Sequence, residues 1–553
     1  MFNLKEIKSS NFYYNSLFYD FIFNFDKLKP CYFYDYRNED EFKRRAEDID
    51  DLYDNNYRLK IVNILKSLNS RLSCSQETLS NIDLLKDKKT YVVIGGQQPG
   101  FFTGPIFIIY KILTIIKLSH FLSKFLNCKV VPLFWNASDD SNFEQIDNFY
   151  LLNREIKKIN LSLNKTSWVE NKKRFSNILI PEELIKQKII EVKNCLSPFT
   201  DFTEKIIALF EISLKLAKLN FSNKKGSISL SSFFSVLVTK LFSKYGLVII
   251  DPSELDLKKM AFDMVKFDIS NHEKINSIVR NSGENLKSQG YHSQLLADEN
   301  KLNFFMDVDG ERKRFVKSSF DSFILSDKSF NQEELFKLLK NRISDISLNV
   351  ILRPVFQDMI LPVLAEICGP GEVSYYAQLK KVYEIFSLKT GIVYPRFSAT
   401  IIEAKVEKSI KKLGIDYEEI GEEKGKIRNK IISGSMGKGF DELINGFERD
   451  IFIRLNELKK SIKISAFDRI ERNLRKEIKV LRKKIDSEFE KSSGVVSENL
   501  NKIYMNIFPE NKFQERIINI FSFINKYDFR LIDSIYNLIE PFDFYHKFIV
   551  INS

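Results

Sequence analysis

The sequence YVVIGGQQPGFFTGP at residues 91–105 decides the fold class. Residues 91–94 are a short β-branched run, which is typical of a strand, and a loop rich in glycine and proline follows it. Residues 106–125 then carry apolar side chains at helical spacing, and residues 129–134 are a second short apolar run. The order strand, glycine loop, helix, strand predicts a parallel β-α-β unit.

Other segments extend this pattern along the chain. Residues 247–250, LVII, are a third predicted strand, and the lysine-rich amphipathic segment before it predicts an insertion. Near residues 290–327, strand-like runs alternate with turns, which predicts a second, smaller α+β insertion. Within it, Asp309-Gly310 lies between two strand-like runs and predicts a β-hairpin. Residues 1–88, by contrast, have the spacing of helices.

The C-terminal part has a different composition. Residues 421–439 predict a flexible linker, and residues 440–492, which contain no proline, predict one long helix. A narrow apolar stripe on a charged helix needs a partner, so we expect a coiled-coil hairpin, a dimer, or both. The alternative is a solvent-facing helix packed along the core. The stripe consists of Phe467, Ile470, Leu474, Ile478, Leu481, Ile485 and Phe489.

The composition excludes several classes of protein. The chain has 553 residues, of which 44% are hydrophobic and 13% aromatic, and this excludes general disorder. Its 85 Lys and Arg against 73 Asp and Glu give a net charge of +12, but basic residues mostly alternate with acidic ones, so we expect no nucleic-acid partner. The five cysteines include no CxxC pair, so we expect neither disulfides nor a metal site. The sequence also shows no signal-peptide pattern and no long apolar run, which predicts a cytoplasmic protein without membrane contact.

The glycine loop is the first candidate ligand site. Its glycines expose backbone N–H groups, and the N-terminus of the following helix favours a phosphate or a carboxylate. Gly95 and Gly100 have the outer spacing of a Walker A loop, but phenylalanines replace its Lys and Ser/Thr. The alternative is a tight turn before a helix, although two amides and a hydroxyl favour ligand contact. The candidates are Gly96, Gln97, Gln98, Thr103 and Gly104.

Two further segments carry candidate site residues. Asp139 and Asp140 directly follow a predicted strand, where they could hold an amine or a cation, or cap the next helix instead. Residues 352–378 supply an arginine for anion binding, amides for recognition and a candidate acid or base. The arginine could instead pair with one of the nearby carboxylates. These candidates are Arg353, Gln357, Asp358, Glu372, Tyr375 and Gln378.

Seven segments in this order resemble the bacillithiol biosynthesis cysteine-adding enzymes, the cysteine ligase family called BshC. They are GQQPGFFTGP with Lys111 on the following helix, FWNASDDSNFEQI, GLVIIDPS, LNFFMDVDGER, LRPVFQDMILPVLAEICGPGEVSYYAQL, YPRFS, and the terminal FPENKFQER with FDFYHK. Together they extend over nearly the whole chain.

The resemblance implies an α/β fold with a Rossmann-like parallel-sheet core, two connecting insertions and a C-terminal helical coiled coil that forms a homodimer. The boundaries that we expect are 1–150 for the first part of the core with N-terminal helices, 151–240 for a helical insertion, 241–275 for the return to the core, 276–345 for an α+β insertion, 346–400 for the core, 401–500 for the linker and coiled coil, and 501–553 for a C-terminal segment packed on the core.

The resemblance also implies an activity. A ligase of this family adds L-cysteine to the amino group of glucosaminyl-malate through an amide bond, in the last step of bacillithiol biosynthesis. The candidate residues above would line its core pocket. A nucleotide, ADP or ATP, would bind on the coiled-coil side near the linker and the tail, at Gln514, Arg516 and His546.

The sequence departs from the family at two places. Family members usually read Glu-Asp-His-Asp after the tryptophan strand, whereas this chain has Asp139, Asp140, Ser141 and Asn142 and so lacks the imidazole and one carboxylate. Cys368 stands where a glycine is usual, and we interpret it as a small-residue variant rather than a nucleophile.

For the reaction, we expect the glycine loop to hold a phosphate or carboxylate and Arg353 to neutralise developing negative charge. Asp140 or Glu372 would orient the ammonium group and accept its proton. Two other functions stay open: a different Rossmann-like nucleotide-binding enzyme that activates a carboxylate for another acceptor, and a non-catalytic dimeric scaffold.

Overall fold

The computed structural model describes residues 3–9, 15–143, 146–153, 155–161, 173–196, 198–222, 226–319, 322–421, 424–435, 438–462, 466–492 and 494–552. The chain forms two compact units. The larger contains Tyr13–Ser398 and Glu515–Phe544, and the smaller contains Met1–Phe12, Ala399–Gln514 and Tyr545–Ser553. Among the described residues, no helix combines the length and the apolar character that crossing a membrane requires.

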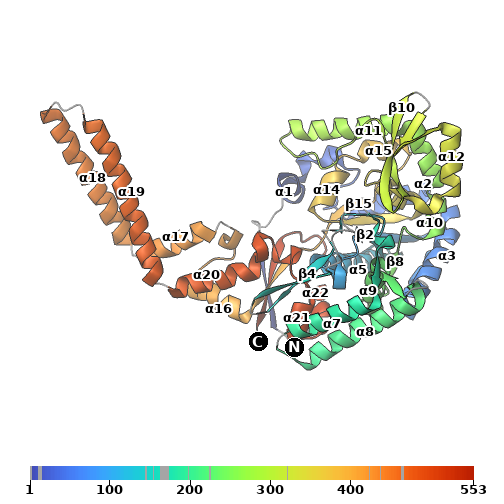
Figure 1. The fold of residues 1–553 in the computed structure, drawn as a ribbon, viewed down its shortest axis with the longest axis horizontal. Helices are drawn as coiled ribbons and strands as arrows, with labels where there is room; N and C mark the ends of the chain where they lie inside the picture. The colour runs from blue at the N-terminus through green and yellow to red at the C-terminus, as the bar shows by residue number, and fades with distance from the viewer. Residues whose placement is uncertain are drawn as a thin grey trace. The chain divides into compact units, whose positions relative to one another are not determined.

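A parallel sheet with strand order β15-β14-β2-β3-β8 forms the centre of the larger unit (Figure 1). Strands β2 and β3 pair from Thr90 opposite Lys129 to Gln97 opposite Asn136, and α5 connects them, which confirms the predicted β-α-β unit. Every side chain of β14 is buried, as expected when both faces of a parallel sheet are covered. The elements are β2 (Thr90–Gln97), α5 (Phe107–Phe125), β3 (Lys129–Asn136), β8 (Val248–Ile250), β14 (Val363–Cys368) and β15 (Ile392–Pro395).

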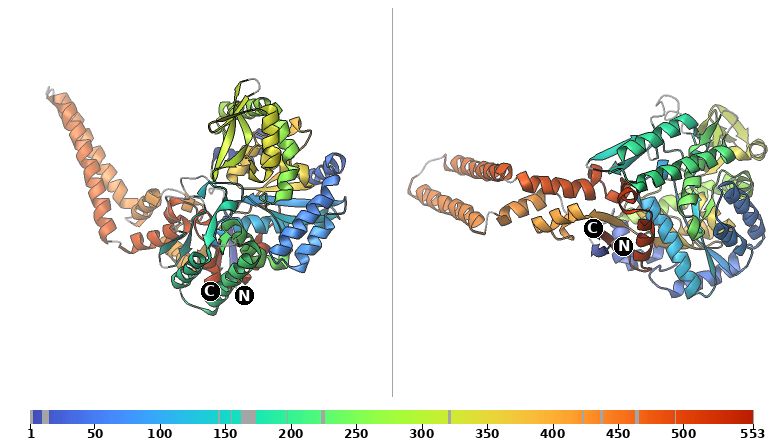
Figure 2. Two further views of the ribbon diagram at one scale, coloured as in Figure 1. Left: turned by 45° about the vertical axis from the view of Figure 1, so that its right-hand side comes forward. Right: turned by 90° about the horizontal axis from the view of Figure 1, so that it is seen from below.

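The first insertion lies between β3 and β8. Its helix α8 packs against α7 and α9, and α7 and α8 lie side by side (Figures 1 and 2). Besides these helices the insertion contains two pairs of short antiparallel strands. The prediction of a helical insertion is therefore only partly right. Its elements are β4 (Asn148–Leu152), β5 (Ile156–Asn160), β6 (Leu179–Pro181), α7 (Glu182–Cys195), α8 (Asp201–Phe221), β7 (Ser227–Ser229) and α9 (Leu230–Leu241).

The second insertion is an antiparallel sheet with strand order β12-β11-β10-β9-β13. The predicted hairpin is confirmed: Asp309 and Gly310 have φ values of 53° and 82°, as the turn between β9 and β10 requires. Apolar side chains of α11 and α12 pack with the sheet in one core. The elements are α11 (Phe262–Ser288), β9 (Lys301–Val308), β10 (Glu311–Ser319), β11 (Ser322–Leu325), β12 (Lys328–Asn331), α12 (Gln332–Asn341) and β13 (Ile346–Leu348).

The smaller unit brings together segments that are far apart in the sequence. Strand β17 (His546–Asn552) lies between β1 (Asn3–Ser9) and β16 (Ala399–Glu403). The prediction of helices throughout residues 1–88 is therefore wrong at the N-terminus, because β1 gains its hydrogen bonds from the last strand of the chain. Helices α16 (Ala404–Leu413) and α20 (Gly494–Ile507) pack on this sheet.

The predicted long helix is two helices, α18 (Lys438–Ser461) and α19 (Phe467–Ser492), which pack as an antiparallel hairpin (Figure 1). Arg482 donates to Asn445 Oδ1 at 2.7 Å, and Arg475 lies 3.9 Å from Glu448, which fixes the pairing. The predicted linker is also partly wrong, because residues 424–435 form the helix α17 (Lys424–Ser435). Residues 422–423 and 436–437 of that linker lie outside the described residues.

Candidate functional site

A cavity of about 690 Å³ lies at the carboxyl ends of the parallel strands in the larger unit. Residues that follow β2, β3, β8, β14 and β15 line it, together with side chains from the second insertion. A ligand site at this edge is what an open parallel sheet favours. Of the sequence candidates, those that line it are Gly96, Gln97, Gln98, Asp139, Asp140, Arg353, Glu372, Tyr375 and Arg516.

The glycine loop folds back on itself beside the cavity. Phe102, Thr103 and Gly104 all have positive φ values of 46°, 73° and 66°. A Cβ atom at Gly100 would lie 2.7 Å from the Cα atom of Gly104, so the crossing requires glycine. Asn519 Nδ2 donates to the carbonyl oxygens of Phe102 and Gly104, both at 2.7 Å. Thr103 and Gly104 therefore shape the loop, and neither lines the cavity.

Lys111 on α5 connects the glycine loop to a second element. Its Nζ donates to Gly96 O at 2.7 Å and to Gln97 Oε1 at 3.2 Å, and it also pairs with Glu372 Oε2. The same Glu372 oxygen accepts from Gly369 N at 2.7 Å and caps α14 (Pro370–Tyr376). Lys111 is fully buried, and these acceptors provide the hydrogen bonds that its amine would otherwise make to water. It was named only within the resembling motif and not as a site residue.

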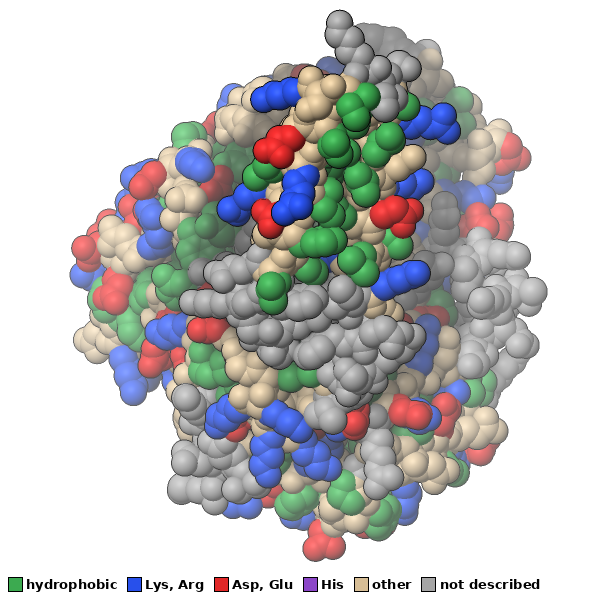
Figure 3. Space-filling view, turned by 90° about the vertical axis from the view of Figure 1, so that its left-hand side faces the viewer, with side chains coloured by type: hydrophobic (Ala, Val, Ile, Leu, Met, Phe, Trp, Pro, Cys, Tyr) green, Lys and Arg blue, Asp and Glu red, His purple; other side chains and the backbone are tan. Residues whose placement is uncertain are grey.

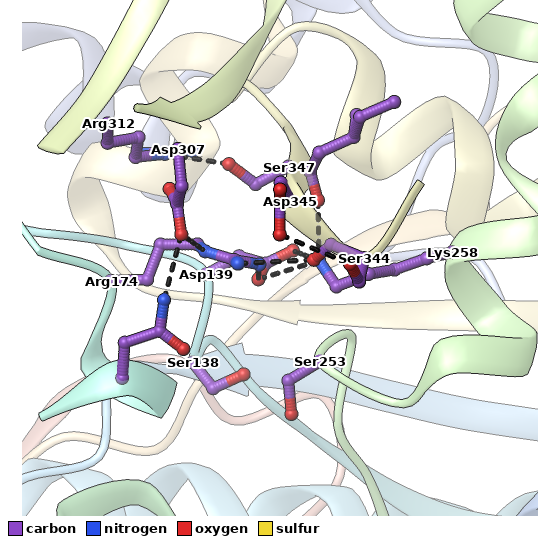
Figure 4. A network of polar contacts seen from close by, with 12 residues as sticks. Ser138, Asp139, Arg174, Ser253, Lys258, Asp307, Arg312, Ser344, Asp345 and Ser347 are labelled. Atoms are coloured by element: carbon purple, nitrogen blue, oxygen red, sulfur yellow. Dashed lines mark hydrogen bonds and ion pairs between the residues drawn. The ribbon is translucent and has the colours of Figure 1, made fainter. Parts of the chain in front are cut away.

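Asp139 belongs to a buried ion network that joins the core to both insertions (Figure 4). Its carboxylate lies 3.1 Å from Arg174 and 3.1 Å from Lys258 on α10 (Leu255–Met260). Arg174 also pairs with Asp307 on β9 at 2.7 Å. Burial opposes ionisation of Asp139, but the nearby cations outweigh it and hold the pKa below its usual value. Burial lowers the pKa of Lys258.

Asp140 has a more open setting than Asp139. Gln98 Nε2 donates to one of its oxygens, and the backbone N–H of Ser141 donates to the other at 2.7 Å. Arg312 lies 4.0 Å away, and 33% of the Asp140 side chain is exposed. Asp140 is therefore the carboxylate that is held by neutral donors and still accessible.

The second insertion supplies a cationic wall that the sequence analysis missed. Arg312 on β10 lies 3.9 Å above the ring of Phe305, and its Nε donates to Ser347 Oγ at 2.9 Å. Burial lowers the pKa of Arg312 to about 10. Arg314 lines the cavity two residues further along the same strand. The alternation of side chains along the strand indicates that Arg312 and Arg314 share one face. It does not indicate that this face lines the cavity, because that depends on how the insertion folds onto the core.

Arg353 on α13 (Leu352–Ile360) faces the cavity near α14. Its Nη2 donates to the hydroxyl of Tyr375 at 3.3 Å. The suggested alternative partners of Arg353 are engaged elsewhere: Asp358 pairs with Arg45 at 2.9 Å, and Glu372 pairs with Lys111. Burial opposes the charge of Arg353, but nearby Tyr375, Asp140 and Glu372 outweigh it and raise its pKa.

Three other candidates from residues 352–378 do not line the cavity. Gln357 is buried in α13, and burial raises the pKa of Asp358 to about 6. Gln378 Oε1 accepts from the backbone N–H groups of Gln294 and Leu295, both at 2.8 Å, and so holds a segment that does line it. Burial raises the pKa of the Cys368 thiol well above its usual value, which agrees with its not being assigned as a nucleophile.

The three predicted nucleotide ligands are divided between the two units. Gln514 belongs to the smaller unit, where its amide exchanges hydrogen bonds with the backbone of Ile401 at 2.8 and 2.9 Å. His546, also in that unit, lies 3.0 Å from Thr400 Oγ1 through Nε2. Arg516 instead lines the cavity of the larger unit.

The charge balance of the cavity lining favours an anionic ligand. Seven cationic side chains face three carboxylates, which are Asp139, Asp140 and Glu372. Within the described part of the chain, no cluster of three or more His, Cys, Asp or Glu residues is placed to hold a metal ion. The cations are Lys111, Lys258, Arg312, Arg314, Arg353, Arg396 and Arg516.

A parallel sheet with a cationic cavity at its carboxyl edge, in a chain that also carries a helical hairpin, defines a Rossmann-like protein with a coiled-coil domain. The chain belongs to the BshC family of bacillithiol biosynthesis. Residues 2–397 match the family's N-terminal Rossmann-like domain, and residues 399–551 match its C-terminal coiled-coil domain. The predicted family and fold class are thereby confirmed.

Relatives with the printed name "Putative cysteine ligase BshC" align along almost the whole chain. The protein of Desulforamulus reducens is 28% identical over 536 residues, which is 95% of this chain and 96% of the relative. That of Natranaerobius thermophilus is 28% identical over 93% of both chains, and that of Bacillus cereus strain G9842 is 27% identical over 96% and 97%. The prediction of a cysteine ligase family in bacillithiol biosynthesis is confirmed.

Proposed function

We propose that this chain joins the carboxyl carbon of L-cysteine to the amino nitrogen of glucosaminyl-malate and that the cavity of the larger unit is the site of the reaction. The observation that carries the proposal is the excess of cations around one accessible carboxylate, Asp140, at the carboxyl edge of the sheet. An acceptor with a malyl group brings carboxylates to be neutralised, and its amine needs a base.

Amide formation from a free carboxylate is uphill in water, so we propose ATP as the co-substrate that supplies activation of the cysteine carboxyl group. The cavity of about 690 Å³ and its excess of cations are compatible with polyanionic ligands. Among the lining residues, Arg353 neutralises the charge that develops on the carbonyl oxygen. Arg312 and Arg314, on the wall of the second insertion, face the carboxylates of the malyl group.

Asp140 is the proposed base that orients the ammonium group and accepts its proton. Of the two carboxylates considered, Glu372 is held in a structural role by the buried Lys111 and by the N–H of Gly369. Lys111 and Glu372 are positioning residues that hold the glycine loop against α14. Ser141 and Asn142 leave this turn without an imidazole, so a carboxylate carries the proton transfer.

Replacing Asp140 by asparagine is expected to lower kcat/KM for amide formation by about tenfold or more, because the amide keeps the size of the side chain but cannot accept the proton. Product is measured by mass spectrometry under initial-rate conditions. Asp256→Asn is the matched control, because Asp256 is exposed and pairs only along its own helix with Lys259 at 2.8 Å in the described structure. Activity of Asp140→Asn within about twofold of the parent would contradict the role.

One assay separates the proposed function from its alternatives. The chain is incubated with cysteine, glucosaminyl-malate and ATP, and the products are analysed by mass spectrometry. Formation of the thiol product supports the proposal. Turnover of ATP without that product points to a carboxylate-activating enzyme with another acceptor, and binding without turnover points to a scaffold.

We further propose that the helical hairpin forms the homodimer contact. Hydrophobic side chains gather in a stripe on it among charged ones (Figure 3). On α18, Leu443 is 72% exposed and Phe447 53% exposed, one turn apart on the same face. Such a face on a long helix is stabilised by a second hairpin.

The double variant Leu443→Asp/Phe447→Asp is therefore expected to be monomeric, whereas the parent chain and the exposed-site control Asn456→Asp remain dimeric. Light scattering coupled to size-exclusion chromatography gives the mass of each. A monomeric parent chain, or a dimeric double variant with unchanged stability, would refute this contact.

A further inference from the structure

Two arginines converge on one aromatic ring at one end of the cavity. Phe107 begins α5, and the guanidinium carbons of Arg396 and Arg516 lie 5.3 and 4.6 Å from the centre of its ring. Arg396 follows β15 and is buried, whereas Arg516 comes from the C-terminal segment and is exposed. All three residues line the cavity. One cation therefore lies deep and the other is accessible from solvent.

One buried carboxylate pairs closely with Arg396. Glu515 is fully buried, and its two oxygens accept from Arg396 at 2.5 and 3.0 Å. Ser398 Oγ also donates to Glu515 at 3.0 Å. The side chains of Arg396, Arg516 and Glu515 together carry a net positive charge, and the bidentate pairing fixes the plane of the Arg396 guanidinium.

The backbone beside these arginines leaves room for a ligand. Gly369, Pro370 and Gly371 line the same cavity. A Cβ atom at Gly369 would lie 3.6 Å from Arg396 Nε, and a Cβ atom at Gly371 would have no atom within 4 Å. The lack of a side chain at Gly369 therefore leaves space next to Arg396 open, and Gly371 adds no side chain to the cavity.

We propose that this end of the cavity, formed by Phe107, Arg396, Arg516 and Gly369–Gly371, is a subsite for the phosphate groups of a nucleoside triphosphate. The proposal rests on the proposed function and names where its co-substrate binds. Guanidinium groups bind phosphate through paired N–H donors, and two of them from different segments suit a polyphosphate better than a single carboxylate. The ring of Phe107 orients both cations by cation–π contact. The cationic wall of the second insertion, with Arg312 stacked on Phe305, remains for the carboxylates of the acceptor.

The test is the affinity of the full chain for ATP, inorganic pyrophosphate, inorganic phosphate and cysteine, measured by calorimetry. Arg516→Gln is expected to weaken the binding of ATP and of pyrophosphate by about tenfold or more, while the affinity for cysteine is unchanged. Arg516→Lys is expected to lie between Arg516→Gln and the parent, because it retains the charge but loses the planar fork. Arg530→Gln is the control, since Arg530 lies in the same C-terminal segment, is exposed and pairs with Asp528 at 3.0 Å.

Each other outcome overturns the subsite. The phosphate subsite is refuted if Arg516→Gln binds ATP and pyrophosphate as tightly as the parent does. It is also refuted if the parent binds neither of them. Weaker ATP binding with unchanged pyrophosphate binding shows recognition of the nucleoside, and a loss confined to cysteine shows a carboxylate site. Inorganic phosphate that binds as tightly as ATP shows a site for the free ion. Because the readout is binding, a chain that binds as expected but forms no product contradicts only the proposed function.

Discussion

Replacing Arg353 by alanine is expected to lower kcat/KM for amide formation by about 100-fold or more, the largest effect on activity that we predict. Arg353 lines the cavity, and nearby Tyr375, Asp140 and Glu372 favour its charge despite burial. Its removal takes away the cation proposed to neutralise the developing oxyanion. The contact to Tyr375 at 3.3 Å is a long one, so the fold is expected to lose little stability.

Initial rates measured by mass spectrometry test this prediction, with circular dichroism to compare the folds. Arg353→Lys should recover part of the rate because it restores the charge. Arg530→Ala, at an exposed arginine, should behave as the parent. A rate for Arg353→Ala within about twofold of the parent, in a folded chain, would remove Arg353 from the mechanism.

Asp139→Asn is expected to lower the free energy of unfolding of the larger unit by about 3–5 kcal/mol, the largest effect on stability that we predict. The carboxylate lies 3.1 Å from both Arg174 and Lys258, whose side chains are each 5% exposed. An asparagine of the same size keeps the packing but leaves two buried cations without that charge. Since Asp139 joins β3 to the insertions, the loss is expected to reach both of them.

Urea unfolding followed by circular dichroism measures the difference, with Asp256→Asn as the exposed control. The pKa of Asp139 is lower in the folded chain than usual. Its contribution is therefore present above the ordinary value of about 4 and is lost as the pH falls through the folded pKa. The parent and the variant should converge in stability at acid pH. A difference below about 1 kcal/mol at pH 7, or one that does not shrink in acid, would contradict the role.

Local features of the fold could be predicted because short-range chemistry encodes them. The glycine loop between β2 and α5 and the Asp309-Gly310 turn both depend on residues that permit positive φ. The N-terminal strand could not be predicted, because its partner β17 is at the other end of the chain. The break between α18 and α19 was missed since no proline or glycine marks it, and α17 formed where glycines had indicated a linker.

Some residues of the candidate site could likewise be predicted from the sequence, and others could not. Asp139 and Asp140 were found because side chains after parallel strands meet at one edge of the sheet. Arg312 was missed because the second insertion must fold before that strand lines the cavity. Gln514 and Arg516 are two residues apart, yet they belong to different units, and sequence proximity alone could not show this. A role in nucleotide binding stays a prediction for Gln514, Arg516 and His546.

The most direct test of the proposed chemistry follows the oxygen atoms of the cysteine carboxyl group. Cysteine labelled with ¹⁸O in both carboxyl oxygens is incubated with the chain, ATP and glucosaminyl-malate. If the carboxyl group is activated and then attacked by the amine, one labelled oxygen remains in the amide product and the other appears in phosphate or AMP. Product that forms while neither phosphate nor AMP carries the label would contradict the account.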